Sequence, residues 1–153
     1  MKKICFDRRN LLLFVLMLLL DAGSKFAARH LRGELPLIKG VLSLRLCENT
    51  GAAFSVLEGH PAAALLLSGA VLVGLCLYLC LAQTRGAERT ALHMVLAGGC
   101  GNFLERLLRG AVTDFLSPEF IRFPVFNLAD VYVTCGVGLL ILLLFRRDAQ
   151  IRK

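Results

Sequence analysis

The stretch NLADVYVTCGVGLLILLLF, residues 127–145, decides the fold class of this chain. It is a largely apolar run with about the twenty residues that a helix needs to cross ~30 Å of hydrocarbon. Asp130, the acidic residue in this run, lies near its beginning. An ionised carboxylate at the edge of a membrane is costly and usually serves a function. The run therefore predicts a transmembrane helix with a functional group at one end.

Three further segments, residues 10–28, 61–82 and 91–108, have a similar apolar character. The third is the shortest and carries four polar or charged side chains: His93, Asn102, Glu105 and Arg106. With 57% hydrophobic and 19% charged residues, the 153-residue chain is far too apolar for an ordinary soluble domain. We expect an all-α integral membrane protein, a single domain over residues 1–153 with four transmembrane helices.

Lys and Arg residues indicate the orientation of these helices. They are dense in three short stretches, residues 1–9, 83–90 and 146–153, and more dilute in the long connections 29–59 and 109–126. The positive-inside rule therefore places both termini in the cytoplasm and both long connections outside. Because the net charge of +7 is spread over segment ends and forms no single stripe, we expect no nucleic-acid partner.

The N-terminus allows two interpretations. A basic start, the apolar run 11–20 and small residues at 22–24 are typical of a cleavable signal peptide. Asp21 and Lys25 favour a retained helix, because residues four apart share a helical face and can neutralise one another inside the membrane. The intact mass of the purified protein distinguishes the two.

The first external connection predicts a small sheet. Residues 42–46 alternate between apolar and polar side chains, and turn residues flank them at Pro36, Gly40 and 49–51. We expect short strands over about residues 35–57, on the outer face of the membrane. Asn49 and Gly51 would offer an amide and a close backbone approach to a peptide, with an ordinary turn as the alternative.

Cysteine and histidine usage does not indicate a metal site. The six cysteines contain no CxxC pair, and the three histidines lie in different segments. Cys47 is the one cysteine clearly within an external connection. We therefore expect no metal, no cofactor and no obligatory external disulfide.

Acidic and amide side chains gather at the predicted outer edge. Asn102, Glu105 and Arg106 share about one turn and predict a hydrogen-bond network facing the bundle, although a snorkelling Arg at a helix end is common. Asn127 with Asp130 three residues later is typical of a helix N-cap, which alone would explain Asp130. Asp114, sixteen positions before Asp130, could likewise cap a turn around residues 117–118.

The two aspartates together predict more than capping. Two carboxylates brought together at a membrane edge cannot both ionise cheaply, so one keeps a proton while the other can act as a base. Asp114 and Asp130 therefore supply the minimum equipment for aspartyl-type hydrolysis.

In order and spacing, five blocks of this chain resemble those of signal peptidase II, the lipoprotein signal peptidase. They are Asp21 with Lys25, Asn49-x-Gly51-Ala52-Ala53-Phe54, Gly101-Asn102-x-x-Glu105-Arg106, Gly110-x-Val112-x-Asp114-Phe115 and Phe126-Asn127-x-Ala129-Asp130. The resemblance implies an aspartyl endopeptidase of the bacterial inner membrane. Such an enzyme removes the signal peptide from diacylglyceryl-modified prolipoproteins just before the lipidated cysteine. It also implies a small external β-cradle.

The same resemblance implies roles for individual residues. Asp114 and Asp130 would be the catalytic pair that activates water. The substrate-binding or supporting residues would be Asn49, Gly51, Asn102, Arg106, Asn127, Asp21, Lys25 and Glu105. Glu105 departs from the family, which usually has Asp there, and Ala22 replaces a common amide. The expected partners are lipid-modified prolipoproteins and membrane lipids, and the expected state is a monomer.

A non-enzymatic membrane protein is the alternative, either a small transporter or a scaffold subunit with an intramembrane charge network. A transporter should carry its charges near the midplane, often on broken or repeated helices. Here the charges gather at the outer ends and no repeat is visible, which favours the peptidase.

Overall fold

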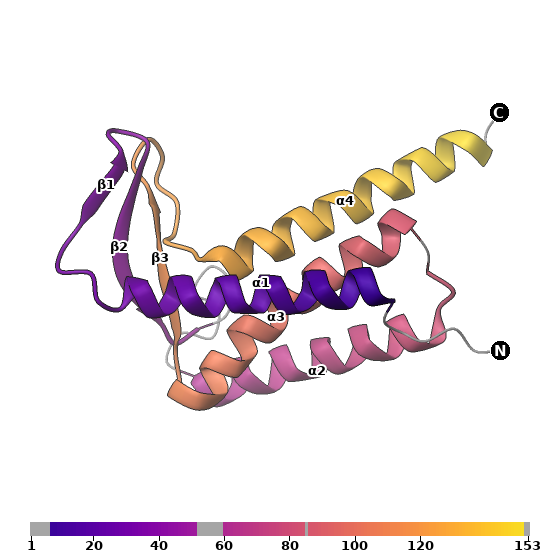
Figure 1. Ribbon diagram of the computed structural model, residues 1–153, viewed down its shortest axis with the longest axis horizontal. Helices are drawn as coiled ribbons and strands as arrows, with labels where there is room; N and C mark the ends of the chain where they lie inside the picture. The colour runs from indigo at the N-terminus through magenta and orange to yellow at the C-terminus, as the bar shows by residue number, and fades with distance from the viewer. Residues whose placement is uncertain (1–6, 52–59, 85, 152–153) are drawn as a thin grey trace.

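A computed structural model describes residues 7–51, 60–84 and 86–151. Within these residues the helices are α1 (Arg8–Ala28), α2 (Pro61–Leu81), α3 (Gly86–Arg109) and α4 (Leu128–Ile151). The strands are β1 (Leu35–Ile38), β2 (Leu42–Asn49) and β3 (Val112–Pro118). The helices form one elongated bundle, and the sheet projects from the end opposite the start of α1 and the end of α4 (Figure 1).

All four predicted helices are present, with shifted ends. α3 begins five residues before its predicted start at 91, and α4 continues six residues past its predicted end at 145. By length and composition, α1, α2 and residues 128–147 of α4 could each cross a membrane. α3, predicted as a fourth span, does not reach this standard, because its polar residues dilute its apolar ones.

The outer faces of the bundle are apolar. α2 buries only Ala64 and Leu79 among its residues, while Leu66 and Leu81 project outward. Broad exposed apolar surfaces of this kind mark membrane or protein contact. The bundle is therefore built to face lipid on its outer side.

α3 occupies the middle of the bundle and packs against the three other helices (Figure 1). Glycines permit its close approach to α4. A Cβ added at Gly98 would lie 2.2 Å from the carbonyl oxygen of Ala129, and one at Gly136 would lie 2.8 Å from that of Ala91. Small residues at such crossings let membrane helices pack backbone to backbone.

The sheet has three antiparallel strands in the order β1-β2-β3. The predicted strands within 35–57 are present as β1 and β2, while residues 52–57 of that region lie outside the described residues. The prediction missed β3, which enters from the connection between α3 and α4. Most β3 residues are buried, including consecutive ones, so the alternating pattern of a half-buried strand is lacking.

Pairing of β2 with β3 positions Asp114. The register sets Cys47 opposite Asp114, Glu48 opposite Thr113 and Asn49 opposite Val112. β2, from the first connection, thereby reaches a strand more than sixty residues further along the chain. Residues 117–118, considered above as a turn that Asp114 could cap, form the end of this strand instead.

Candidate active site

Asp114 lies in the middle of β3 with only 3% of its surface exposed. Its carboxylate accepts a hydrogen bond from Asn49 Nδ2 at 3.0 Å and another from Asn127 Nδ2 at 2.6 Å. These donors come from the end of β2 and from the residue before α4. Three separate elements therefore meet at this carboxylate.

Asp130 lies in the first turn of α4 and is half-buried. Asn127 Oδ1 accepts from Asp130 N at 3.0 Å, and Asp130 Oδ2 accepts from Asn127 N at 3.1 Å. This reciprocal pair is a capping box and confirms the predicted N-cap. Asp130 Oδ1 also accepts from Asn102 Nδ2 at 2.8 Å, so the residue both caps the helix and reaches α3.

Asn127 connects the two aspartates. It is completely buried, with its side-chain amide on Asp114 and its backbone N–H on Asp130. Its Nδ2 atom makes a further hydrogen bond of 3.2 Å to Asn102 Oδ1. The arrangement holds Asp114 and Asp130 on either side of one buried amide.

A buried ion pair on α1 supports the hydrogen bond between Asn102 and Asp130. Lys25 Nζ lies 2.8 Å from Asp21 Oδ2 and donates to Asn102 Oδ1 at 2.8 Å. Asp21 Oδ1 accepts from Ala129 N at 3.0 Å. Because Lys25 occupies Asn102 Oδ1, the amide nitrogen of Asn102 is directed to Asp130. The predicted pairing of Asp21 with Lys25 is confirmed.

Gly101 is required for this ion pair to fit. A Cβ at Gly101 would lie 2.5 Å from Asp21 Oδ2, closer than carbon and oxygen can approach without displacement. α1 and α3 therefore approach each other through a glycine at the level of the charged network.

Glu105 contacts Thr113, at the start of β3. Its carboxylate accepts from Thr113 N at 3.0 Å and Thr113 Oγ1 at 2.5 Å, and forms a 2.6 Å ion pair with Arg29. Lys25 Nζ lies 3.4 Å from Glu105 Oε2. Glu105 thus fixes the residue next to Asp114. Neither Arg29 nor Thr113 was singled out from the sequence. The available signals were that Arg29 lies four residues after Lys25 and that Thr113 directly precedes Asp114.

Arg106, on the same turn of α3, contacts Gly51, which lies two residues after the end of β2. Its Nη2 atom donates to the carbonyl oxygen of Gly51 at 2.8 Å, and Gly51 N donates to Asn49 Oδ1 at 2.9 Å. Arg106 Nε is buried without a hydrogen-bond partner among residues 7–51, 60–84 and 86–151. The guanidinium therefore retains a donor that no described group uses.

The environment of Asp114 favours its neutral form. Burial raises the pKa of Asp114 from 3.8 to about 6, and the nearby charge of Asp130 acts in the same direction. The hydrogen bonds from Asn49 and Asn127 oppose this rise. A carboxyl group titrating near neutrality can donate or accept a proton at physiological pH.

The structure brings all ten predicted site residues into one connected network at the sheet end of the bundle. In the described part of the chain, no group of three or more His, Cys, Asp or Glu side chains could hold a metal ion. Two carboxylates, their amide donors and a buried guanidinium are the groups available for chemistry.

Comparisons with known proteins show the family to which this chain belongs. The family model described as signal peptidase (SPase) II matches residues 13–146. The chain belongs to the signal peptidase II family. It is therefore related to proteases that act on signal peptides, and its two aspartates lie within the matched region.

Individual relatives cover nearly the whole chain. The lipoprotein signal peptidase of Halalkalibacterium halodurans is 36% identical over 145 residues, 91% of this chain and 93% of the relative. That of Brevibacillus brevis is 35% identical, over 88% of this chain and 93% of the relative. These relatives show that the likeness to the signal peptidase II family extends over almost the full length of the chain.

Two solved structures, both described as bacterial membrane enzymes determined by the in meso method, share the fold. One has a TM-score of 0.89 at 26% identity, covering 98% of this chain and 95% of its own. The other has a TM-score of 0.82 at 28% identity, covering 94% and 97%. With its apolar helices, this member of the signal peptidase II family is a multi-pass bacterial membrane protein.

Proposed function

We propose that this protein is an aspartic endopeptidase that removes the signal peptide from diacylglyceryl-modified prolipoproteins, cutting before the lipidated cysteine. The observation that carries the proposal is the linkage of Asp114 and Asp130 through Asn127. Family membership supports the substrate class. The two-carboxylate site supports the aspartic type of chemistry.

The two carboxylates lie in different environments. Asp114 is buried with a raised pKa, which suits the residue that keeps the shared proton. Asp130 is half-buried, lies at a helix N-terminus and accepts hydrogen bonds from Asn102 and Asn127, an arrangement that suits a negative charge. We assign Asp130 as the base and Asp114 as the acid.

Hydrolysis then proceeds in two steps, the attack of water and the cleavage of the C–N bond, and each step includes two proton transfers. Asp130 takes a proton from water as the water oxygen attacks the scissile carbonyl carbon, while Asp114 gives its proton to the carbonyl oxygen. When the C–N bond breaks, Asp130 protonates the leaving amine and the intermediate returns a proton to Asp114. General acid–base assistance of this kind contributes about 10²- to 10⁴-fold.

The remaining polar residues position the substrate and the catalytic pair. Arg106 Nε, buried without a partner in the described part of the chain, is suited to donate to a peptide carbonyl. Asn49 and Gly51 border the same region, because Arg106 already binds the Gly51 carbonyl. The supporting residues Asp21, Lys25 and Glu105 act through Asn102 and Thr113.

We further propose that α3 is a fourth transmembrane helix, with both chain termini in the cytoplasm and the sheet outside. Burial supports this, since Asn102, Glu105 and Arg106 make their hydrogen bonds within the protein, as polar groups at membrane depth must. The cationic ends of α1 and α4 lie opposite the sheet (Figure 1), in agreement with the positive-inside rule. A retained α1 is part of this proposal, because it supplies Asp21 and Lys25.

This geometry suits a lipid-bearing substrate. The site lies where the helices meet the sheet, so acyl chains can stay in lipid while the peptide bond reaches water. One chain supplies every residue of the network, which is consistent with a single-domain monomer. The transporter alternative is disfavoured because the network is confined to one end of the bundle.

Cleavage of a synthetic lipidated precursor peptide by purified variants tests the proposal. We expect Asp114→Asn and Asp130→Asn each to lower kcat at least 10²-fold, and an unlipidated peptide to be a poor substrate of the native enzyme. Glu119→Gln is the matched control, because Glu119 is an exposed acid beyond the end of β3. Undiminished cleavage by both aspartate variants would exclude the aspartic mechanism.

A further inference from the structure

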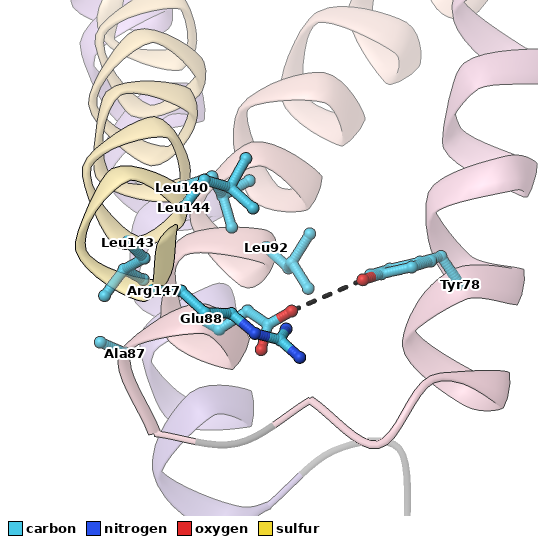
Figure 2. A pocket seen from close by; sticks show the side chains of 8 residues that line it. All are labelled: Tyr78, Ala87, Glu88, Leu92, Leu140, Leu143, Leu144 and Arg147. Atoms are coloured by element: carbon cyan, nitrogen blue, oxygen red, sulfur yellow. Dashed lines mark hydrogen bonds between the residues drawn. The ribbon is translucent and has the colours of Figure 1, made fainter. Parts of the chain in front are cut away.

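A cavity of about 510 Å³ lies at the end of the bundle opposite the candidate active site. It is lined by residues of α2, the start of α3 and the C-terminal half of α4 (Figure 2). None of its lining residues belongs to the network around Asp114 and Asp130. Its volume falls within the range of small-molecule sites, about 300–1,000 Å³.

The wall of the cavity is mainly leucine. Leu92 of α3 is buried at its base, while Leu140, Leu143 and Leu144 of α4 line one side. α2 and α4 lie on different sides of α3 (Figure 1), and Tyr78 of α2 faces the leucines across the cavity (Figure 2). Because the outer faces of α2 and α4 are apolar, the compound most available to this cavity is an acyl chain.

One end of the cavity carries two opposite charges. Glu88 and Arg147 both line the cavity, and the Tyr78 hydroxyl donates to Glu88 Oε1 at 3.5 Å (Figure 2). Among residues 7–51, 60–84 and 86–151, no ion pair joins Glu88 to Arg147. A cation and an anion therefore line the same cavity, each available to a ligand.

We propose that this cavity binds one phospholipid whose headgroup carries a phosphate and a primary ammonium. The phosphate binds Arg147, the ammonium binds Glu88 and the acyl chain lies along the leucines. Cavities between membrane helices with basic residues on the cytoplasmic side suit lipid headgroups, and this end is the cytoplasmic one in the orientation proposed above. An anionic lipid without an amine would leave Glu88 facing a like charge.

Native mass spectrometry of the full-length protein with phosphatidylethanolamine provides the first test. We expect one tightly retained lipid per chain, and several-fold weaker retention for Glu88→Gln and Arg147→Gln. Arg146→Gln is the matched control, because Arg146 is the neighbouring exposed cation and does not line the cavity. Equal loss in the Arg146 control, or stronger retention of phosphatidylglycerol than of phosphatidylethanolamine, would overturn the proposal.

A fluorescence measurement in bilayers locates the lipid. The chain contains no Trp, so Leu143→Trp introduces a single reporter in the cavity and Leu142→Trp a control on the exposed face of the same helix. Brominated phosphatidylethanolamine at low mole fraction in a phosphatidylcholine bilayer should quench the cavity reporter several-fold more than the control. Equal quenching would show annular lipid only. Displacement of the quencher by a synthetic signal sequence with a basic N-terminus would assign the cavity to the substrate instead.

Discussion

Asn127 Nδ2 donates to Asp114 Oδ1 at 2.6 Å, the shortest hydrogen bond that either proposed catalytic carboxylate accepts. The same residue caps α4 through Asp130. β3 and the start of α4 are therefore held in one geometry by a single buried amide. Asn127 thus fixes the position of the Asp114 carboxylate relative to that of Asp130, although no hydrogen bond joins the two carboxylates directly.

Replacing Asn127 by Ser separates the capping function from the contact with Asp114. Ser is as good an N-cap as Asn, but its short side chain cannot reach Asp114. We expect kcat to fall about 10- to 100-fold, since leaving a buried polar group unsatisfied costs about 1–3 kcal/mol. The same cost should lower the Tm in detergent by a few degrees. Wild-type kcat in Asn127→Ser would contradict the proposed bridge, and Asn127→Ala should lose stability as well.

The raised pKa of Asp114 predicts how stability depends on pH. Between its ordinary value of 3.8 and its folded value of about 6, the folded protein binds more protons than the unfolded chain, so stability falls as the pH rises through this window. The shift corresponds to about 3 kcal/mol at most. The Tm of the native protein should therefore fall relative to that of Asp114→Asn as the pH rises from 4 to 7. Thermal melts of both proteins in detergent measure this difference.

The same pKa predicts the alkaline side of the activity profile. If Asp114 must hold a proton, kcat/KM should decline as the pH rises above about 6. The pH profile of cleavage measures this directly. A rate that stays constant up to pH 9 would show that a protonated Asp114 is not required.

Gly101 should not tolerate a side chain. In Gly101→Ala, the added Cβ would meet Asp21 Oδ2 at 2.5 Å and disturb the ion pair of Asp21 with Lys25. Overpacking of this kind costs about 1–3 kcal/mol. Gly138→Ala on α4 is the control, because nothing lies within 4 Å of its added Cβ. Equal Tm values for the two variants would refute the close approach.

Changing Glu105 to Asp should destabilise this protein. The side chain is one methylene shorter and cannot keep its bonds to Thr113 and Arg29 together. We expect a loss of about 1–3 kcal/mol in the free energy of unfolding and lower cleavage activity. Thr113→Ser, which keeps the hydroxyl, should remain near wild type while Thr113→Val loses stability. Improved activity in Glu105→Asp would show that Glu105 is not adapted to its neighbours.

Cys47 offers a test of orientation. It is exposed on β2, in the part of the chain proposed to lie outside the membrane. A membrane-impermeant maleimide should label it in intact spheroplasts, and Cys47→Ser should abolish that labelling. Labelling that requires lysis would place the sheet in the cytoplasm and reverse the proposed topology.

Local features of the fold could be predicted from short stretches of sequence. The apolar runs predicted the helices, the spacing of Asp21 and Lys25 predicted their ion pair, and Asn127 with Asp130 predicted the cap. The ion pair and the cap each depend on residues within about one helical turn, where backbone geometry alone fixes which side chains meet.

Several decisive contacts join segments distant in sequence, and the tertiary structure alone decided them. Neither the pairing of β3 with β2 nor the attachment of Glu105 to Arg29 and Thr113 leaves a periodic signal. The charged cavity at the far end likewise depends on how α2 and α4 lie against α3. The sequence by itself determined which segments form the helices, because long apolar runs and their polar ends can be read from composition. Which polar groups meet depends on how the packed helices and strands bring distant side chains together.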